Sequence, residues 1–257
     1  TLLASSAASD VYKRQTWEEL VEQAVENGGV QFDATSIYYD LGFVRACGGY
    51  IFNYQNGAYD TSDIGLANDG AVQAYHFLDD LCNRYGLITA DVTADIARSN
   101  FQNGKCAYYI GGPWDIDGFT SAETPFGITE MPTFHGQAFV TPVGTQVSFV
   151  GKDSDKQEPA WSFIKYLIEN GAKDLCEAGD RIPARLSDQE LEEIRENAYA
   201  KAFIVQINQG EPMPTVSEMG QLWSIHVNNI RSMWSGEQTP EEAAKNMVAQ
   251  LEEAVEL

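Results

Sequence analysis

Apolar and polar positions alternate along this chain mostly with the period of an α-helix. Between residues 69 and 86, Ala71, Tyr75, Leu78 and Cys82 recur at intervals of three or four positions. This spacing predicts a helix with one apolar face, and Gly86 is typical of its end. Similar stripes occur along most of the chain, so helices are predicted to dominate it.

Helix starts are also readable from the sequence. Residues 16–19, 187–190 and 239–242 each place Thr or Ser three positions before Glu. This is the spacing of a capping box, in which the hydroxyl and the carboxylate bond to each other's backbone amides. Each of the three segments is therefore predicted to begin a helix.

Short apolar runs that end at Gly or Pro are predicted to be strands. The sequence predicts strands over 107–110, 126–131 and 143–150. Because single strands alternate with helices, the pattern predicts an α/β fold.

One of these runs leads directly to a candidate binding residue. Residues 107–118 read Ala-Tyr-Tyr-Ile-Gly-Gly-Pro-Trp-Asp-Ile-Asp-Gly, and Gly111 to Pro113 end the strand just before Trp114. Ligands of α/β proteins bind beyond the carboxyl ends of strands, and a flat indole there suits the C–H face of a sugar ring. The alternative, that Trp114 fills the core beneath its loop, is equally open on the local sequence.

Composition excludes several classes of partner. The chain has 257 residues, and its 38 acidic against 16 basic residues give a net charge of −22. Nucleic acids and anionic membrane surfaces attract basic patches, so neither is an expected partner. The four cysteines and three histidines show no ligand spacing, and we predict isolated thiols, no metal site and no cofactor.

The first fifteen residues do not fit the pattern that follows. Residues 10–15 read Asp-Val-Tyr-Lys-Arg-Gln, which is similar to translated adapter sequence at the ends of assembled fragments. Residues 1–15 are therefore predicted to be a non-native leader. A trimmed signal peptide is the less favoured alternative.

Six motifs in fixed order carry a family resemblance. They read Thr-Trp-Glu-Glu-Leu at 16–20, Gly-Gly-Tyr-Ile-Phe at 48–52, Tyr-Asp…Asp-Ile-Gly-Leu at 59–66, Ile-Gly-Gly-Pro-Trp at 110–114, Met-Pro-Thr-Phe-His-Gly at 131–136 and Gly-Glu-Pro-Met-Pro…Met…Leu-Trp at 210–223. From residue 16 onward the chain resembles the family 1 extracellular solute-binding proteins of ABC sugar importers, most of all their maltose/maltodextrin-binding members.

The resemblance implies an α/β, two-lobe, periplasmic-binding-protein-like (type II) fold with most of the N-terminal lobe missing. Residues 16–145 and 196–257 would form the C-lobe, and residues 146–195 would be a returning segment of the N-lobe. The chain would cross between lobes near 143–148 and near 192–199.

The resemblance also assigns site residues. Trp114 and Trp223 match the family's two stacking tryptophans, and Tyr38 matches an aromatic residue at a sugar-facing helix start. Tyr39 is a weaker neighbour, and Asp115 either accepts hydrogen bonds from a sugar or caps the following turn. The remaining tryptophans are predicted to be packing residues, at positions 17, 161 and 234.

Three positions depart from the family pattern and leave the exact sugar open. An acidic residue, a proline and an arginine of the maltose-binding members are replaced here by Ser36, Ile37 and Val227.

The implied function is binding without catalysis. The protein would capture maltose, maltodextrin or a similar oligosaccharide as a monomer and deliver it to the membrane subunits of an ABC transporter. It would be extracellular or periplasmic, and the sequence leaves open whether the missing N-terminus carried a lipid anchor.

Two alternatives come from other classes of protein. Asp115 and Asp117 could serve a glycosidase-like enzyme, but two acids on one loop do not flank a glycosidic bond. A sugar sensor that docks on a receptor is not distinguishable from a transport protein in the sequence.

Overall fold

The computed structural model describes residues 2–5 and 16–255. The helices within these ranges are α1 (Trp17–Asn27), α2 (Ile37–Ala46), α3 (Asp69–Asp79), α4 (Ala94–Gln102), α5 (Ile116–Ser121), α6 (Gln157–Asn170), α7 (Ala172–Gly179), α8 (Leu186–Gln189), α9 (Glu192–Arg195), α10 (Ala198–Gln209), α11 (Met219–Trp234) and α12 (Pro240–Val255). The strands are β1 (Leu2–Ser5), β2 (Val30–Gln31), β3 (Phe52–Gln55), β4 (Ala58–Ile64), β5 (Tyr108–Gly111), β6 (Gly127–Thr129), β7 (Pro142–Val143) and β8 (Glu211–Pro212).

Two of the three predicted capping boxes are confirmed. At 16–19 and again at 239–242, the Thr hydroxyl accepts a hydrogen bond from the backbone amide of the Glu. The Glu carboxylate accepts a hydrogen bond from the backbone amide of the Thr. The prediction at 187–190 is wrong, because Ser187 lies inside α8. There Arg185 precedes the helix and forms two hydrogen bonds with Asp188, which secures this short turn instead.

The main sheet has the strand order β2-β5-β1-β6. β2 runs parallel to β5, whereas β1 is antiparallel to both β5 and β6. All four residues of β5 are buried, so the strand that leads to Trp114 is a central support of the sheet. The predicted leader thus contributes a strand at Leu2–Ser5, while residues 6–15 lie outside the described ranges and the origin of residues 1–15 stays a prediction.

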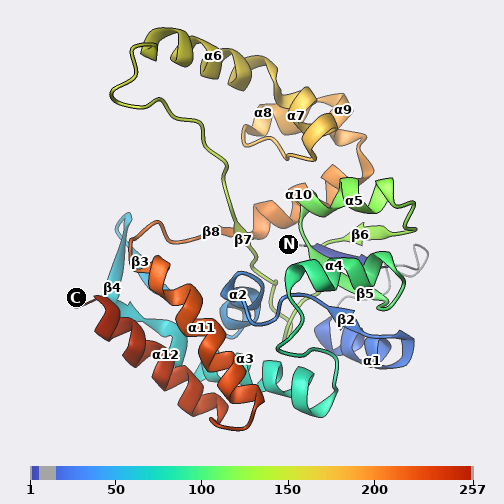
Figure 1. Ribbon diagram of the computed structural model, residues 1–257, viewed down its shortest axis with the longest axis vertical. Helices are drawn as coiled ribbons and strands as arrows, with labels where there is room; N and C mark the ends of the chain where they lie inside the picture. The colour runs from blue at the N-terminus through green and yellow to red at the C-terminus, as the bar shows by residue number, and fades with distance from the viewer. Residues whose placement is uncertain (1, 6–15, 256–257) are drawn as a thin grey trace.

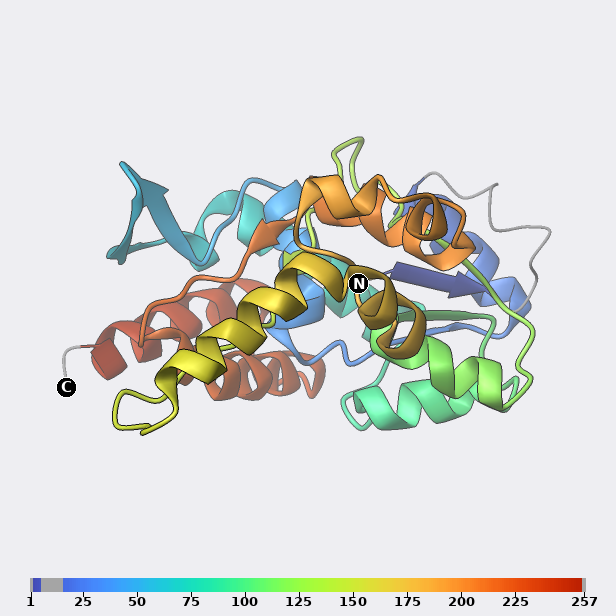
Figure 2. The same cartoon turned by 90° about the horizontal axis from the view of Figure 1, so that it is seen from above.

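The largest hydrophobic core is organised around the aromatic ring of Trp17. This ring contacts Phe32, Phe43, Phe77 and Phe139 at centroid distances of 4.6 to 6.4 Å. The contacts join α1, α2 and α3 to the segment before β7. Buried residues of α11 and α12 complete the same cluster, and these two helices lie at the end of the body that carries the β3–β4 hairpin (Figure 2).

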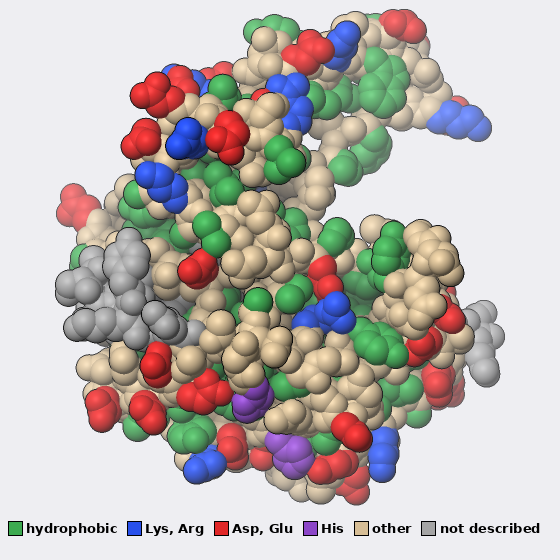
Figure 3. Space-filling model, turned by 180° about the vertical axis from the view of Figure 1, so that it is seen from behind, with side chains coloured by type: hydrophobic (Ala, Val, Ile, Leu, Met, Phe, Trp, Pro, Cys, Tyr) green, Lys and Arg blue, Asp and Glu red, His purple; other side chains and the backbone are tan. Residues whose placement is uncertain are grey.

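An arm consisting of α6 to α9 stands away from this body (Figure 1). It is reached through an extended segment, residues 144–156, and Figure 3 shows the open hollow between the arm and the body. The predicted strand over 143–150 is wrong beyond Val143. β7 pairs only with the two residues of β8, and past that point Val147 and Phe149 are exposed with no strand beside them.

The helix α6 presents its apolar residues to solvent. No residue of α6 is buried, and the side chain of Trp161 is 52% exposed. The prediction that Trp161 is a packing residue is therefore wrong, because half of its side chain is in contact with solvent in the described chain. The same prediction is confirmed for Trp17 and Trp234, which are 0% and 7% exposed.

Candidate functional site

Trp114 lies in a tight turn directly beyond β5. The strand ends at Gly111, a 3-10 turn covers Pro113–Asp115, and α5 begins at Ile116. A Cβ atom on Gly112 would approach the Trp114 ring to 2.3 Å, so the indole folds back over Gly112 and would have to shift if this residue had a side chain. The ring is 44% exposed and is not a core plug.

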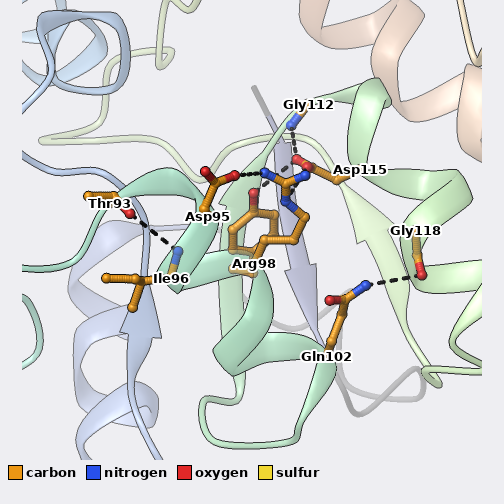
Figure 4. Close-up of polar contacts among 9 residues, drawn as sticks. Thr93, Asp95, Ile96, Arg98, Gln102, Gly112, Asp115 and Gly118 are labelled. Carbon is orange, nitrogen blue, oxygen red and sulfur yellow. Dashed lines mark hydrogen bonds and ion pairs between the residues drawn. The ribbon is translucent and has the colours of Figure 1, made fainter.

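The buried side chain of Asp115 stabilises this turn through its polar contacts. Its Oδ2 accepts hydrogen bonds from the Tyr109 hydroxyl at 2.9 Å and from the Gly112 amide at 3.1 Å. Its Oδ1 lies 3.3 Å from Nε of Arg98, which also pairs with Asp95 (Figure 4). With 2% of its side chain exposed, Asp115 serves the turn, and its predicted contact with a sugar stays a prediction.

Burial is the main influence on the carboxyl group of Asp115. It raises the pKa of this group, while the hydrogen bonds from Gly112 and Tyr109 and the positive charge of Arg98 act in the opposite direction. Burial also raises the pKa of the Tyr39 hydroxyl, and the nearby Asp115 charge adds to this shift. Both shifts favour the neutral form of the group, that of Asp115 less strongly because its hydrogen bonds and the nearby Arg98 charge oppose burial.

Replacing this carboxylate is expected to loosen the turn. Asp115→Asn should lower the free energy of unfolding by about 1–3 kcal/mol, because Arg98 loses its buried partner and one buried acceptor becomes a donor. Urea unfolding measures the change. The exposed neighbour Asp117 offers the control Asp117→Asn, and equal losses in the two variants would contradict this role for Asp115.

Tyr38 and Tyr39 join Trp114 from the start of α2. Ser36 caps this helix by accepting a hydrogen bond from the Tyr38 amide at 3.4 Å. The Tyr38 ring centroid lies 6.3 Å from that of Trp114 and 5.3 Å from that of Tyr39. Tyr38 is half-buried and Tyr39 is buried. Three of the five predicted site residues thus form one aromatic cluster.

Trp223 lies on α11, in a different part of the body. Its side chain is 39% exposed, so it is not sealed in the core. Within the described residues Trp223 has no ring contact with Trp114, and a shared ligand surface for the two indoles stays a prediction.

A groove beside the β3–β4 hairpin was not anticipated from the sequence. It encloses about 830 Å³ between this hairpin and residues 211–216. Tyr50, Tyr54 and Tyr59 line it, together with an ion pair of 2.9 Å between Arg45 and Glu211. The recurrence of tyrosines around the hairpin turn at 56–57 was the available sequence signal.

A buried polar pair connects α2 to α11. Asp40 of α2 and His226 of α11 are both 0% exposed, and Oδ2 of Asp40 lies 3.7 Å from Nε2 of His226. Nδ1 of His226 is 3.0 Å from the carbonyl oxygen of Thr35, to which it donates in this tautomer. Burial lowers the pKa of His226 to about 4, and burial followed by the charge of Asp33 raises the pKa of Asp40 well above its ordinary value.

This arrangement gives a pH-dependent prediction. The unfolded chain releases the Asp40 proton above the ordinary pKa of 3.8, whereas the folded chain retains it to higher pH. Stability contributed by this group is therefore complete below pH 3.8 and is lost as pH rises toward the folded pKa. Asp40→Asn removes this titration, so its stability relative to the natural chain should increase by about 1.4 kcal/mol per pH unit over that window.

Urea unfolding of the two chains at several values between about pH 5 and pH 8 measures the effect. A constant difference across this range would show that Asp40 is ionised in the folded chain.

The described chain contains neither a group of metal-ligating side chains nor a helix fit to span a membrane. Across residues 2–5 and 16–255, no three His, Cys, Asp or Glu side chains are grouped to hold a metal ion. No helix in these ranges is sufficiently long and apolar to cross a membrane. The four cysteines are free thiols; Cys106 and Cys176 are buried, whereas Cys47 and Cys82 are half-buried.

Exposed aromatic rings beyond a central strand of an α/β body are an arrangement expected of a protein that binds a solute on a preformed surface. A sequence profile described as bacterial extracellular solute-binding protein matches residues 3–202. The chain belongs to this family, as its motifs predicted.

Characterised relatives bind oligosaccharides. A maltooligosaccharide ABC transporter solute-binding lipoprotein of Streptococcus pneumoniae is 27% identical over 227 residues, which are 87% of this chain and 53% of that protein. A galactooligosaccharide-binding protein of Bacillus subtilis is 29% identical over 80% of this chain and 51% of its own length. The chain thus spans about half the length of these relatives, which are solute-binding proteins rather than enzymes.

Solved structures confirm the periplasmic-binding-protein-like fold. The maltose-maltodextrin binding protein of Alicyclobacillus acidocaldarius superposes with a TM-score of 0.90 at 30% identity, covering 98% of this chain and 69% of that one. A cyclo/maltodextrin-binding protein complexed with maltotetraose gives a TM-score of 0.88 at 26% identity, covering 99% and 68%.

Proposed function

We propose that this chain recognises carbohydrate as part of the substrate-binding component of an ABC importer, with maltodextrin or a similar oligosaccharide as ligand. The observation that carries the proposal is the exposed Trp114 ring, held beyond β5 and beside Tyr38. Such rings offer a flat apolar surface to the C–H face of a sugar. Tyr39, Asp115 and Trp223 complete the proposed set of ligand-binding residues. Within this set, the role of Asp115 is to hold the turn that carries Trp114.

The proposal includes binding without catalysis. Asp115 is buried and bonded to Tyr109, Gly112 and Arg98, so it is not placed to donate a proton to a glycosidic oxygen. Asp117 follows it by two residues in the same turn region and does not provide an opposing acid. The solute-binding character of the relatives supports the same conclusion.

We also propose the lobe assignment that the sequence suggested. Residues 16–145 and 196–257 would form one lobe, and residues 146–195 would belong to a second lobe with chain beyond these 257 residues. Support comes from the extended segment 144–156 and from α6, whose apolar residues are left uncovered. As a lipid-anchored or periplasmic monomer, the protein would deliver its ligand to membrane subunits of the transporter.

This assignment predicts that the apolar face of α6 contributes little to the stability of the chain itself. Phe163→Ser and Tyr166→Ser should each change the free energy of unfolding by less than about 0.5 kcal/mol, because both side chains are more than 60% exposed. Thermal unfolding measures the effect, with the buried Phe203→Ser as a destabilising control. A large loss in either α6 variant would place a packing partner within the chain.

Fluorine NMR of the chain labelled with 5-fluorotryptophan tests the binding proposal. Titration with maltotetraose should shift the resonances of Trp114 and Trp223, with weak affinity because one wall of the proposed cleft is absent. A galactooligosaccharide titrated in parallel distinguishes the two ligand types named by the relatives. Absence of any shift would contradict carbohydrate binding, and release of shorter sugars during the titration would favour the enzyme alternative.

A further inference from the structure

A buried polar bridge joins the two helices that carry the proposed stacking rings. On α2, Asp40 follows Tyr38 by two residues, within the first turn of the helix. On α11, His226 follows Trp223 by three residues, so the two lie one turn apart. The approach of Asp40 to His226 therefore connects the two helices that carry Tyr38 and Trp223.

The second contact of His226 reaches the entry of α2. Its Nδ1 pairs with the Thr35 carbonyl oxygen at 3.0 Å, and Thr35 precedes Ser36, which caps the helix. The His226 ring thus forms one hydrogen bond to the backbone ahead of the cap and lies close to, without a hydrogen bond to, a side chain in the first turn of α2. The directional hydrogen bond to Thr35 favours one placement of α11 against the start of α2.

An apolar pair would pack these helices without this restriction. Asp40, His226 and the hydroxyl of Tyr75 are fully buried, and within the described chain neither Asp40 oxygen has a hydrogen bond. Buried polar atoms that are incompletely paired oppose stability, whereas they can favour one arrangement of the packed elements over others. The contact between Asp40 and His226 is therefore better explained as selecting one packing arrangement of α2 and α11 than as adding to the stability of the fold.

Charge around the bridge is accounted for by few groups. Burial raises the pKa of Asp40 and that of Tyr75 on α3; the charge of Asp33, in the loop before α2, adds to the shift of Asp40, and the charge of Asp40 adds to that of Tyr75. No lysine or arginine contributes to the shifts of Asp40, Tyr75 or His226. Because the side chains of Asp40 and His226 are both 0% exposed, their contact is shielded from solvent.

We infer that His226 and Asp40 are positioning residues that set the placement of Trp223 relative to Tyr38 and Trp114 for ligand binding. This inference rests on the proposed function. Neither residue touches the ligand; both act through the helices that carry the rings.

The test compares variants of the full 257-residue chain labelled with 5-fluorotryptophan. His226→Leu removes both polar contacts, and His226→Gln keeps a donor for the Thr35 carbonyl. Asn229→Leu is the matched control, because Asn229 is also buried on α11 but bonds to Ile225 and Gln250 instead of α2. The Trp223 resonance is assigned with Trp223→Phe.

Without ligand, His226→Leu should shift or broaden the Trp223 resonance, and Asn229→Leu should leave it in place. With maltotetraose, His226→Leu should weaken binding by about tenfold or more, because a small displacement of a contacting ring has a large effect. His226→Gln and Asn229→Leu should stay within about threefold of the natural chain. If His226→Leu does not fold, Asp40→Leu on α2 replaces it, and the same shift of the Trp223 resonance and the same loss of affinity are expected.

An unchanged Trp223 resonance in the folded His226 and Asp40 variants would overturn the inference. Equal losses of affinity in His226→Leu and Asn229→Leu, in proportion to lost stability, would overturn it as well. Failure of the natural chain to bind maltotetraose would instead contradict the proposed function, and the ligand-free resonance still decides whether the bridge positions Trp223.

Discussion

Trp114→Ala is expected to abolish measurable binding of maltotetraose while the chain stays folded. The Trp114 ring is the most exposed member of the aromatic cluster and lies beyond a fully buried strand, so its loss removes ligand surface without opening the core. Covering about 100 Å² of indole contributes about 2.5 kcal/mol at about 25 cal/mol per Å². That free energy corresponds to a loss of affinity of about seventyfold.

The measurement is the same fluorine NMR titration, followed at Trp223. Trp161→Ala is the matched control, because Trp161 is an exposed tryptophan on α6, outside the proposed site. The control should bind as the natural chain does. Retained binding by Trp114→Ala, or equal losses in both variants, would remove Trp114 from the site.

Trp17→Ala is expected to have the largest effect on stability. Its ring is fully buried and contacts four phenylalanines, which belong to α2, α3 and two loop segments. Removal of such a side chain leaves a cavity that these rigid rings cannot fill, and core Trp→Ala changes destabilise by about 3–5 kcal/mol.

Urea unfolding followed by circular dichroism measures this loss. Trp161→Ala again serves as control and should change the free energy of unfolding by less than about 0.5 kcal/mol. A loss below about 1 kcal/mol in Trp17→Ala would show that the aromatic core repacks around the cavity.

Local chemistry explains what the sequence predicted correctly. The caps at 16–19 and 239–242 depend only on residues within one turn, and the Gly-Gly-Pro stop before Trp114 acts on its own backbone. The order of the six motifs predicted the family and the fold, because the spacing between motifs depends on the arrangement of elements along the whole chain. Tyr38 and Trp114, 76 positions apart, were thereby placed in one site, and their rings lie 6.3 Å apart.

Non-local packing explains what the sequence did not predict. The apolar stripe of α6 is the same whether a neighbour covers it or not, so Trp161 was assigned to packing. The bridge between Asp40 and His226 joins residues 186 positions apart, and neither belongs to a motif. The same limit applies to Asp115, because its Arg98 partner on α4 was not evident from the loop sequence.

The antiparallel position of β1 has a consequence for handling this protein. Leu2–Ser5 lies between β5 and β6 and bonds to both. Without these residues, β5 and β6 would each present a row of unpaired amide and carbonyl groups, and such edges recruit other strands. Cleavage ahead of residue 16 is therefore expected to produce aggregation through intermolecular strand pairing at these edges.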